Sequence, residues 1–249
     1  MKKRTALMFS AGLFLVVLAV FFSLIINGSL KNEGEIILPQ GSAPIEEAVD
    51  IAKRNQRVIK EVTIDTQNVK DVISTLSKPA SYSYIAQTVY YYPEGSSTSS
   101  SFVGASLDMC RVITYDAVGN VKKNLILTKD NVYMWGEGDS VYFKGNRGDF
   151  SIEDEAGLPT YESILSVRTE DIIRAGLAEH NGRLCVYLTS SHELGRYTRD
   201  WYVDIDSGLL YSCDTKENGA LIYSVVCFDM SIGVQDMSLF VLPNGQSLR

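Results

Sequence analysis

The first 27 residues constrain this chain more than any other feature. Met1-Lys2-Lys3-Arg4 is followed by an uncharged, mostly apolar run, Thr5–Asn27. A helix of that length, rising about 1.5 Å per residue, can cross a hydrocarbon core about 30 Å thick. Because the cations precede the run, the positive-inside rule holds the N-terminus in the cytoplasm. We therefore expect a single-pass protein of the cell membrane whose C-terminal domain is extracytoplasmic.

A cleaved signal peptide is the competing interpretation of this segment. Such a peptide has an apolar core of about 7–15 residues and a small-residue cleavage site. Here the run is longer and ends in Ser23–Asn27 without an A-x-A pattern, and no lipidation cysteine follows it. Both interpretations export the rest of the chain, and they differ only in whether it stays tethered to the membrane.

Charge excludes one class of partner. The chain has a formal net charge of −7, and removing the three N-terminal cations leaves −10 on the exported part. Nucleic acids and anionic lipid surfaces bind basic patches, so we expect no nucleic-acid partner. The expected organisation is a cytoplasmic tip and transmembrane signal-anchor (residues 1–27), a linker or stalk (28–60) and one extracytoplasmic domain (61–249).

Two helices and one strand are expected before the main run of strands. Apolar residues at helical spacing predict a short stalk helix over Ile45–Gln56, and alternation over Arg57–Ile64 favours a strand. Thr66 is suited to cap a second helix, which Lys78-Pro79 would end. The apolar face of this second helix consists of Val69, Val72, Ile73 and Leu76.

From Ser81 onward the pattern is that of antiparallel strands. Tyr82–Tyr92 is a β-branched and aromatic run, which we expect to end at Pro93-Glu94-Gly95 and the serine tract Ser96–Ser101. Short helices are expected at Tyr161–Val167 and Thr169–Ala175. The other expected strands, joined by short turns, are Ala105–Tyr115, Val121–Leu127, Val132–Trp135, Val141–Lys144, Arg183–Thr189, Thr198–Ile205, Leu209–Asp214 and Leu221–Phe228.

This order resembles a known group of proteins. Trp201–Leu210 is similar to a strand–turn–strand motif that turns through Asp-x-Gly, and Asp236–Pro243 is similar to a closing D-x-x-F-x-x-P pattern. Over Thr66–Gly245 the chain resembles the LolA/LolB-type lipoprotein carriers and the related MucB/RseB-type sensor domains. The resemblance implies an α+β fold: a large curved antiparallel sheet forming an open half-barrel, with a long N-terminal helix and short inserted helices. It also implies an apolar concave face that binds acyl chains or regulates a partner.

Alternating apolar residues identify candidates for that concave face. Val186 and Leu188 share one side of their expected strand with Leu184, and Trp201 shares one side of its strand with Val203. The same pattern also fits a filled core. The expected ligand-binding residues are Met109, Ile113, Met134, Leu184, Val186, Leu188, Trp201 and Val203.

Catalytic and metal-binding motifs are not evident. His180 and His192 are the two histidines, and neither stands in a zinc-binding spacing. Glu153-Asp154-Glu155 lacks the alternating ligands and turn glycine of a calcium loop. We expect no cofactor and no enzymatic activity.

The expected function is therefore that of a non-enzymatic cell-envelope protein. It would bind an acyl chain or a lipidated ligand such as a lipoprotein, or act as a regulatory platform for an envelope partner. The alternative is an interaction-only scaffold with a filled core, and a weaker alternative is a carboxylate-dependent hydrolase.

Two predictions concern strand register. A three-residue loop at Glu217–Gly219 would place Cys227 about 13 Å beyond the partner of Cys213, and a two-residue turn would place the two cysteines on opposite faces, so we expect no bridge between them. A three-residue Asp206-Ser207-Gly208 connection pairs Trp201 with Cys213 and turns the indole inward. An exported chain with two further cysteines, Cys110 and Cys185, could form disulfides or keep buried thiols.

Overall fold

The computed structural model describes residues 43–147 and 156–248. They belong to one compact unit, Ser42–Arg249. The expected membrane span, Thr5–Asn27, lies outside the described residues. Within the described ranges, no helix is both long enough and apolar enough to cross a bilayer.

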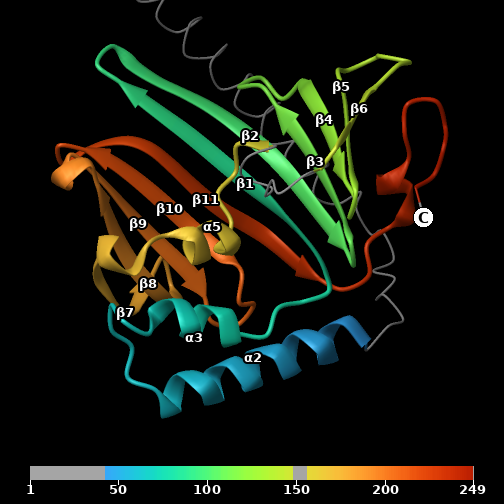
Figure 1. The fold of residues 1–249 in the computed structure, drawn as a ribbon. Coiled ribbons are helices and arrows are strands. Elements are labelled where there is room, and N and C mark those ends of the chain that lie inside the picture. Colours follow the sequence, from blue (N-terminus) through green and yellow to red (C-terminus); the bar gives the residue numbers. More distant parts are fainter. Residues whose placement is uncertain (1–42, 148–155, 249) are drawn as a thin grey trace, which may run out of the picture. The chain divides into compact units, whose positions relative to one another are not determined.

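One large antiparallel sheet organises the described chain (Figure 1). Its eleven strands run in the order β6-β5-β4-β3-β2-β1-β11-β10-β9-β8-β7, so β1 and β11 are neighbours although they stand at opposite ends of the sequence of strands. The strands are β1 (Ser81–Tyr92), β2 (Gly95–Ser106), β3 (Met109–Tyr115), β4 (Val121–Leu127), β5 (Asn131–Trp135), β6 (Phe143–Asn146), β7 (Ile172–His180), β8 (Arg183–His192), β9 (Tyr197–Asp204), β10 (Leu210–Glu217) and β11 (Ala220–Ile232).

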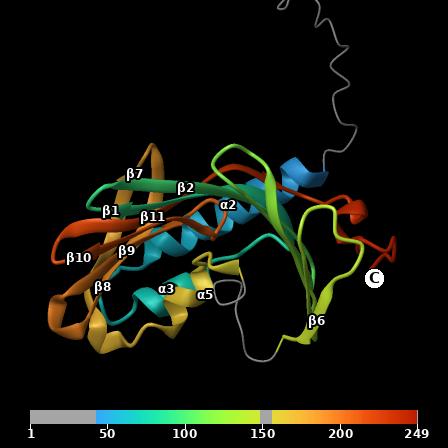
Figure 2. The same cartoon turned by 90° about the horizontal axis from the view of Figure 1, so that it is seen from above.

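The sheet arches over its helices (Figure 2). These are α2 (Ala43–Glu61), α3 (Val69–Thr75) and α5 (Tyr161–Ser166). The connection that carries α5 leaves β6 at one edge of the sheet and enters β7 at the other, so it must cross the sheet. The half-open arrangement that the sequence resemblance implied is confirmed.

Helix α2 is longer than predicted and belongs to the domain. It spans 19 residues and continues through the stretch where a strand was expected from Arg57, so that prediction was wrong. Ile51 and Ile59 are buried, and Ile59 packs in the main core. Asn55 Nδ2 donates to the carbonyls of Ser77 at 2.9 Å and Ile205 at 2.8 Å. Because tertiary packing stabilises this face, the helix is not a free stalk, and the compact unit begins before residue 61.

Helix α3 is shorter than predicted, although its buried face is as expected. Val69, Val72, Ile73 and Leu76 are all buried. The helix begins at Val69 rather than after Thr66, because the Asp65 carboxylate accepts the N–H groups of Gln67 at 2.8 Å and Asn68 at 3.0 Å. The turn that precedes the helix is therefore fixed by a side-chain acceptor.

Two strands were missed in the sequence. The serine tract is not a loop, since it forms half of β2 and pairs with β1 along its whole length. The segment expected as a helix from Thr169 contains one 3₁₀ turn, η1 (Thr169–Asp171), and then becomes β7. In both cases the segment itself has only a weak preference for the extended conformation. It forms a strand because it pairs with a neighbouring strand whose residues favour β structure strongly.

The predicted absence of a Cys213–Cys227 bridge is confirmed, but the expected faces were wrong. The two-residue turn Asn218-Gly219 joins β10 and β11, and a register shift between Thr215 and Lys216 then pairs Cys213 with Val225. Cys227 lies two residues beyond Val225, on the same face as Cys213 and opposite Ala86 of β1. The four cysteines are buried, and none of them is in a disulfide.

Candidate functional site

One half of the helix-bearing face is a filled core. Leu188, Trp201 and Cys213 form a continuous cross-strand row over β8, β9 and β10. Side chains from α3 and α5, including Ile73 and Ile164, pack directly on this row. The Trp201 indole N–H donates to Ser190 Oγ at 3.3 Å, so the polar atom of this buried side chain has a partner.

The other half of the same face is lined by a second apolar row. Tyr84, Val103, Val112, Leu125 and Met134 are successive cross-strand partners over β1 to β5. The first four are at most 7% exposed, and Met134 is half-buried.

Few described side chains from outside the sheet pack on this second row, although Tyr84, Val103, Val112 and Leu125 are themselves buried. Within residues 43–147 and 156–248, only Ala156 and Leu158 come from outside the sheet to pack in its cluster. The two halves join tightly, since the space between Tyr84, Tyr161 and Leu210 is about 10 Å³, close to the minimum that admits one water. We call the surface formed by Tyr84, Val103, Val112, Leu125 and Met134 the second apolar half.

Ionisable groups in the second half are neutral. Burial raises the pKa of the Cys110 and Cys227 thiols to about 12, and it raises the pKa of the Tyr82 and Tyr84 hydroxyls well above its usual value. A thiol is nucleophilic only as its thiolate, so neither cysteine is activated at neutral pH. The second half can therefore bind apolar groups but offers no charged nucleophile.

The sequence-predicted site residues are divided between four places. Val186, Leu188, Trp201 and Val203 lie in the filled core. Leu184 is on β8 but is 52% exposed. Met134 belongs to the second apolar half. Met109 and Ile113 lie on the opposite face of the sheet, where Met109 packs with Tyr133, Phe240 and Leu242.

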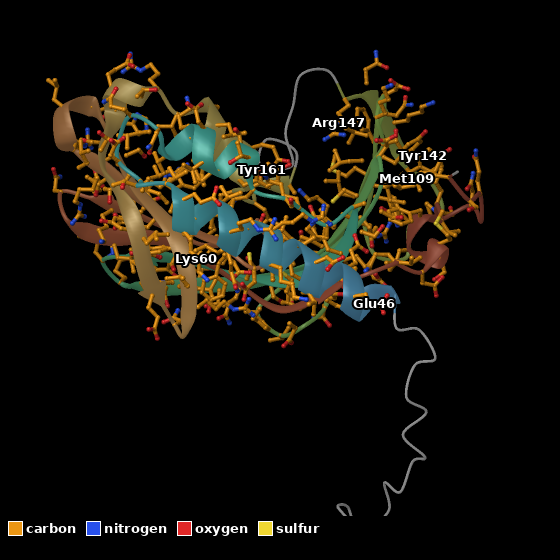
Figure 3. The ribbon with its side chains drawn as sticks, turned by 90° about the horizontal axis from the view of Figure 1, so that it is seen from below. Glu46, Lys60, Met109, Tyr142, Arg147 and Tyr161 are labelled. Carbon is orange, nitrogen blue, oxygen red and sulfur yellow. The ribbon has the colours of Figure 1, made fainter. Side chains whose placement is uncertain are left out.

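Figure 3 shows this separation. Arg147 and Tyr161 flank the second half, whereas Met109 and Tyr142 lie on the far side of the strands. The alternation of side chains along β3 could have revealed this separation. Arg111 shares one face of the strand with Met109 and Ile113, whereas Val112 shares the other face with Cys110. The sequence-based choice of Met109 and Ile113 thus took the mixed face of β3 rather than its apolar one.

Met109 instead lines a pocket of about 420 Å³ on the outer face, at the turns between β2 and β3 and between β4 and β5. Leu107, Lys129, Tyr133 and Leu248 also line it. The pocket is of the size that small ligands occupy. Its polar rim and its position on the outer face distinguish it from the second apolar half.

The histidines have structural partners. His180 Nε2 lies 3.2 Å from Ser212 Oγ, the ring stacks on Tyr202 at 3.8 Å between centroids, and burial lowers the pKa of the imidazole. His192 Nδ1 lies 3.6 Å from an Asp171 carboxylate oxygen. In the part of the chain that the structure describes, no group of three or more His, Cys, Asp or Glu residues is placed to hold a metal ion. Glu153–Glu155 lies outside the described residues.

Comparison with known proteins finds solved structures that resemble this chain in the outline of the fold. No protein-family profile matches the chain, and no curated protein matches it. An uncharacterised conserved protein from Thermus thermophilus is 12% identical, with 82% of this chain and 98% of that chain covered and a TM-score of 0.46.

Two further solved structures are similar at lower scores. A LolA superfamily protein from Nitrosomonas europaea is 9% identical, covering 72% and 98% of the two chains with a TM-score of 0.35. The lipoprotein LppX from Mycobacterium tuberculosis is 8% identical, covering 76% and 98% with a TM-score of 0.36. Since all three TM-scores are below 0.5, none of these proteins indicates what this chain binds.

Proposed function

We propose that the chain is a non-enzymatic cell-envelope protein that binds an acyl chain, free or attached to a lipoprotein, along the second apolar half. The observation that carries the proposal is the contrast within one face of the sheet. The first half is packed by α3 and α5, whereas in the described residues the second is covered only by Ala156 and Leu158. A row of apolar side chains across five strands matches the extended, featureless surface of a hydrocarbon chain.

Energetics favour an apolar occupant. Each methylene removed from water contributes roughly 0.8 kcal/mol, so an acyl chain gains affinity in proportion to the length that it lays on the row. The thiols and hydroxyls that border the row are neutral, and the cation Arg147, which acts on the Cys110 thiol, flanks the row rather than belonging to it. The ligand's headgroup would therefore remain outside the second half.

Two half-buried methionines provide a matched test. Met134 belongs to the second apolar half, on β5, and Met109 lies on the opposite face, on β3. With the compact unit of residues 42–249 and a fluorescent fatty acid as the probe, Met134→Lys should weaken binding at least fivefold, because a desolvated ammonium opposes an apolar ligand. Met109→Lys makes the same chemical change and should leave binding within twofold.

The same titration separates the alternatives. Loss of binding in Met109→Lys alone would assign the probe to the outer 420 Å³ pocket. Absence of binding by the parent, together with no lipid in solvent extracts of the purified protein, would favour the interaction-only scaffold.

A further inference from the structure

The hairpin formed by β1 and β2 is almost free of charge. Its 26 residues, Ser81–Ser106, include a single charged side chain, Glu94, although charged residues make up 21% of the whole chain. The tip of the hairpin lies at one end of the sheet, at the upper left in Figure 1. Glu94 is exposed in the turn at the tip, whereas the two strands beside it carry no charged side chain. Such a surface suits a neutral partner, because the strands need no ion to lose its water and Glu94 disfavours an anionic one.

Exposed tyrosines surround this tip. Tyr90, Tyr91 and Tyr92 are 49%, 40% and 50% exposed. Successive residues of a strand point to opposite faces, so Tyr91 lies on the outer face and its two neighbours on the helix-bearing face. Tyr91 and Tyr92 pair with Ser96 and Gly95, which add hydroxyl and backbone groups but no charge.

The tip is continuous with the second apolar half. The Tyr90 ring packs on Tyr223 of β11, with 4.9 Å between centroids, and Tyr223 in turn packs against the apolar cluster of the second half. The Tyr223 hydroxyl donates to the Gly157 carbonyl at 3.4 Å. Gly157 adjoins Leu158, which belongs to the described cover of the row. Through Tyr223, the tyrosines at the hairpin end are therefore linked to the apolar cluster that contains the row.

We propose that the hairpin tip is a bilayer-contact surface through which an acyl chain passes between a neutral membrane interface and the second apolar half. Tyrosine combines an apolar ring with a hydroxyl that hydrogen-bonds to headgroups and water, and it is enriched at membrane–water interfaces for that reason. This inference rests on the proposed acyl-binding function, and it adds the face of the protein that meets the lipid.

A single fluorophore tests the contact in the full chain. The native cysteines are buried, so a cysteine introduced at an exposed position can be labelled selectively with an environment-sensitive NBD fluorophore. Ser96→Cys places the label in the tip, opposite Tyr91. Leu107→Cys places it beyond the other end of β2, at a site that is 81% exposed.

On reconstitution in phosphatidylcholine vesicles, the label at Ser96→Cys should gain at least threefold in intensity and be quenched by spin-labelled lipid. The label at Leu107→Cys should do neither. Adding Tyr91→Ser and Tyr92→Ser should abolish the response at Ser96→Cys. An equal response at both positions, or none at Ser96→Cys, would overturn the inference, as would a response that requires an added protein rather than lipid.

Fatty-acid binding without vesicles keeps this test independent of the proposed function. That measurement depends on the second apolar half alone. If the label at Ser96→Cys does not respond to vesicles but the protein still binds the fatty acid, only the bilayer contact is refuted. If the parent protein does not bind the fatty acid, the proposed function itself is refuted.

Discussion

Trp201 and Cys213 face each other as cross-strand partners of β9 and β10, and both are buried. The sequence predicts this pair by counting back from a three-residue turn, but the hairpin is built differently. In the pair nearest the turn, Leu210 faces Val203, whereas the three-residue turn would pair it with Asp204. The strands then shift by one residue at Tyr211, so that Cys213 faces Trp201 as predicted. The predicted pair is thus correct because the bulge offsets the turn.

Trp201→Ala should lower the free energy of unfolding by about 3–5 kcal/mol, since the indole is 2% exposed and packed by helices. Urea denaturation of residues 42–249 measures this. In a Trp135→Phe background, the remaining indole should emit at the short wavelengths of an apolar site. Red-shifted emission from the folded protein would place Trp201 in water and invert the assignment of faces.

Asn55 should contribute far more stability than its neighbour Gln56. The buried Asn55 amide makes three hydrogen bonds, two to Ser77 and one to Ile205. Asn55→Ala leaves buried backbone groups unpaired and should cost about 2–4 kcal/mol. Gln56 is exposed and donates only to the Asp206 carboxylate, so Gln56→Ala should cost less than about 0.5 kcal/mol. Equal costs in urea titrations would show that α2 is not held by Asn55.

A substitution at Gly208 tests whether the β9–β10 turn lies as close to the segment after α3 as the structure shows. It has φ 69°, and a Cβ there would lie 2.5 Å from the Ser77 carbonyl oxygen. Gly119 has φ 89°, with no atom within 4 Å of its Cβ position. Both changes to Ala incur backbone strain of about 1 kcal/mol, but Gly208→Ala must also displace backbone. Its melting temperature should therefore fall well below that of Gly119→Ala, and matching temperatures would contradict the collision.

Asp200 should make stability depend on pH. Burial alone would raise the pKa of its carboxyl, but hydrogen bonds from Lys216 at 2.8 Å and Thr189 at 2.6 Å outweigh burial and lower the pKa. In the unfolded chain the value is about 3.9. The ionised carboxylate therefore stabilises the fold above about pH 4, and this contribution disappears as pH falls through the lower folded pKa.

Asp200→Asn should consequently be less stable than the parent at pH 7, and the difference should shrink below pH 4. Urea denaturation at several pH values from 2 to 7 measures the trend. A difference that does not change with pH would mean that the carboxylate's charge is irrelevant to folding.

The elements predicted correctly are those in which local pattern and tertiary partner agree. The buried face of α3 follows from helical spacing alone. The serine tract of β2 has no strand preference of its own, and it is extended because β1 supplies aromatic and β-branched partners along its length. Sequence shows the composition of each strand but not which strand lies beside it, so β2 could not be predicted from its own residues.

The position of the candidate site could not be predicted from the sequence for a related reason. Val112 and Leu125 belong to short strands that carry apolar residues on both faces. Which face is covered by helices depends on where α3 and α5 pack, and they lie over β8 to β10 rather than over β2 to β5. The sequence therefore identified apolar strands correctly, but four of the eight candidate residues, Val186, Leu188, Trp201 and Val203, lie in the half of the sheet that the helices fill.

Photo-crosslinking with a diazirine-bearing fatty acid tests the acyl-binding site most directly. The probe would be bound to residues 42–249, irradiated, and the modified residues located by peptide mass spectrometry. Adducts should cluster on Tyr84, Val112, Leu125 and Met134, the row that crosses β1 to β5 on the helix-bearing face. Adducts confined to Met109, Tyr133 and Leu248 around the outer pocket, or none above the level of the Met134→Lys variant, would contradict acyl binding by the second apolar half.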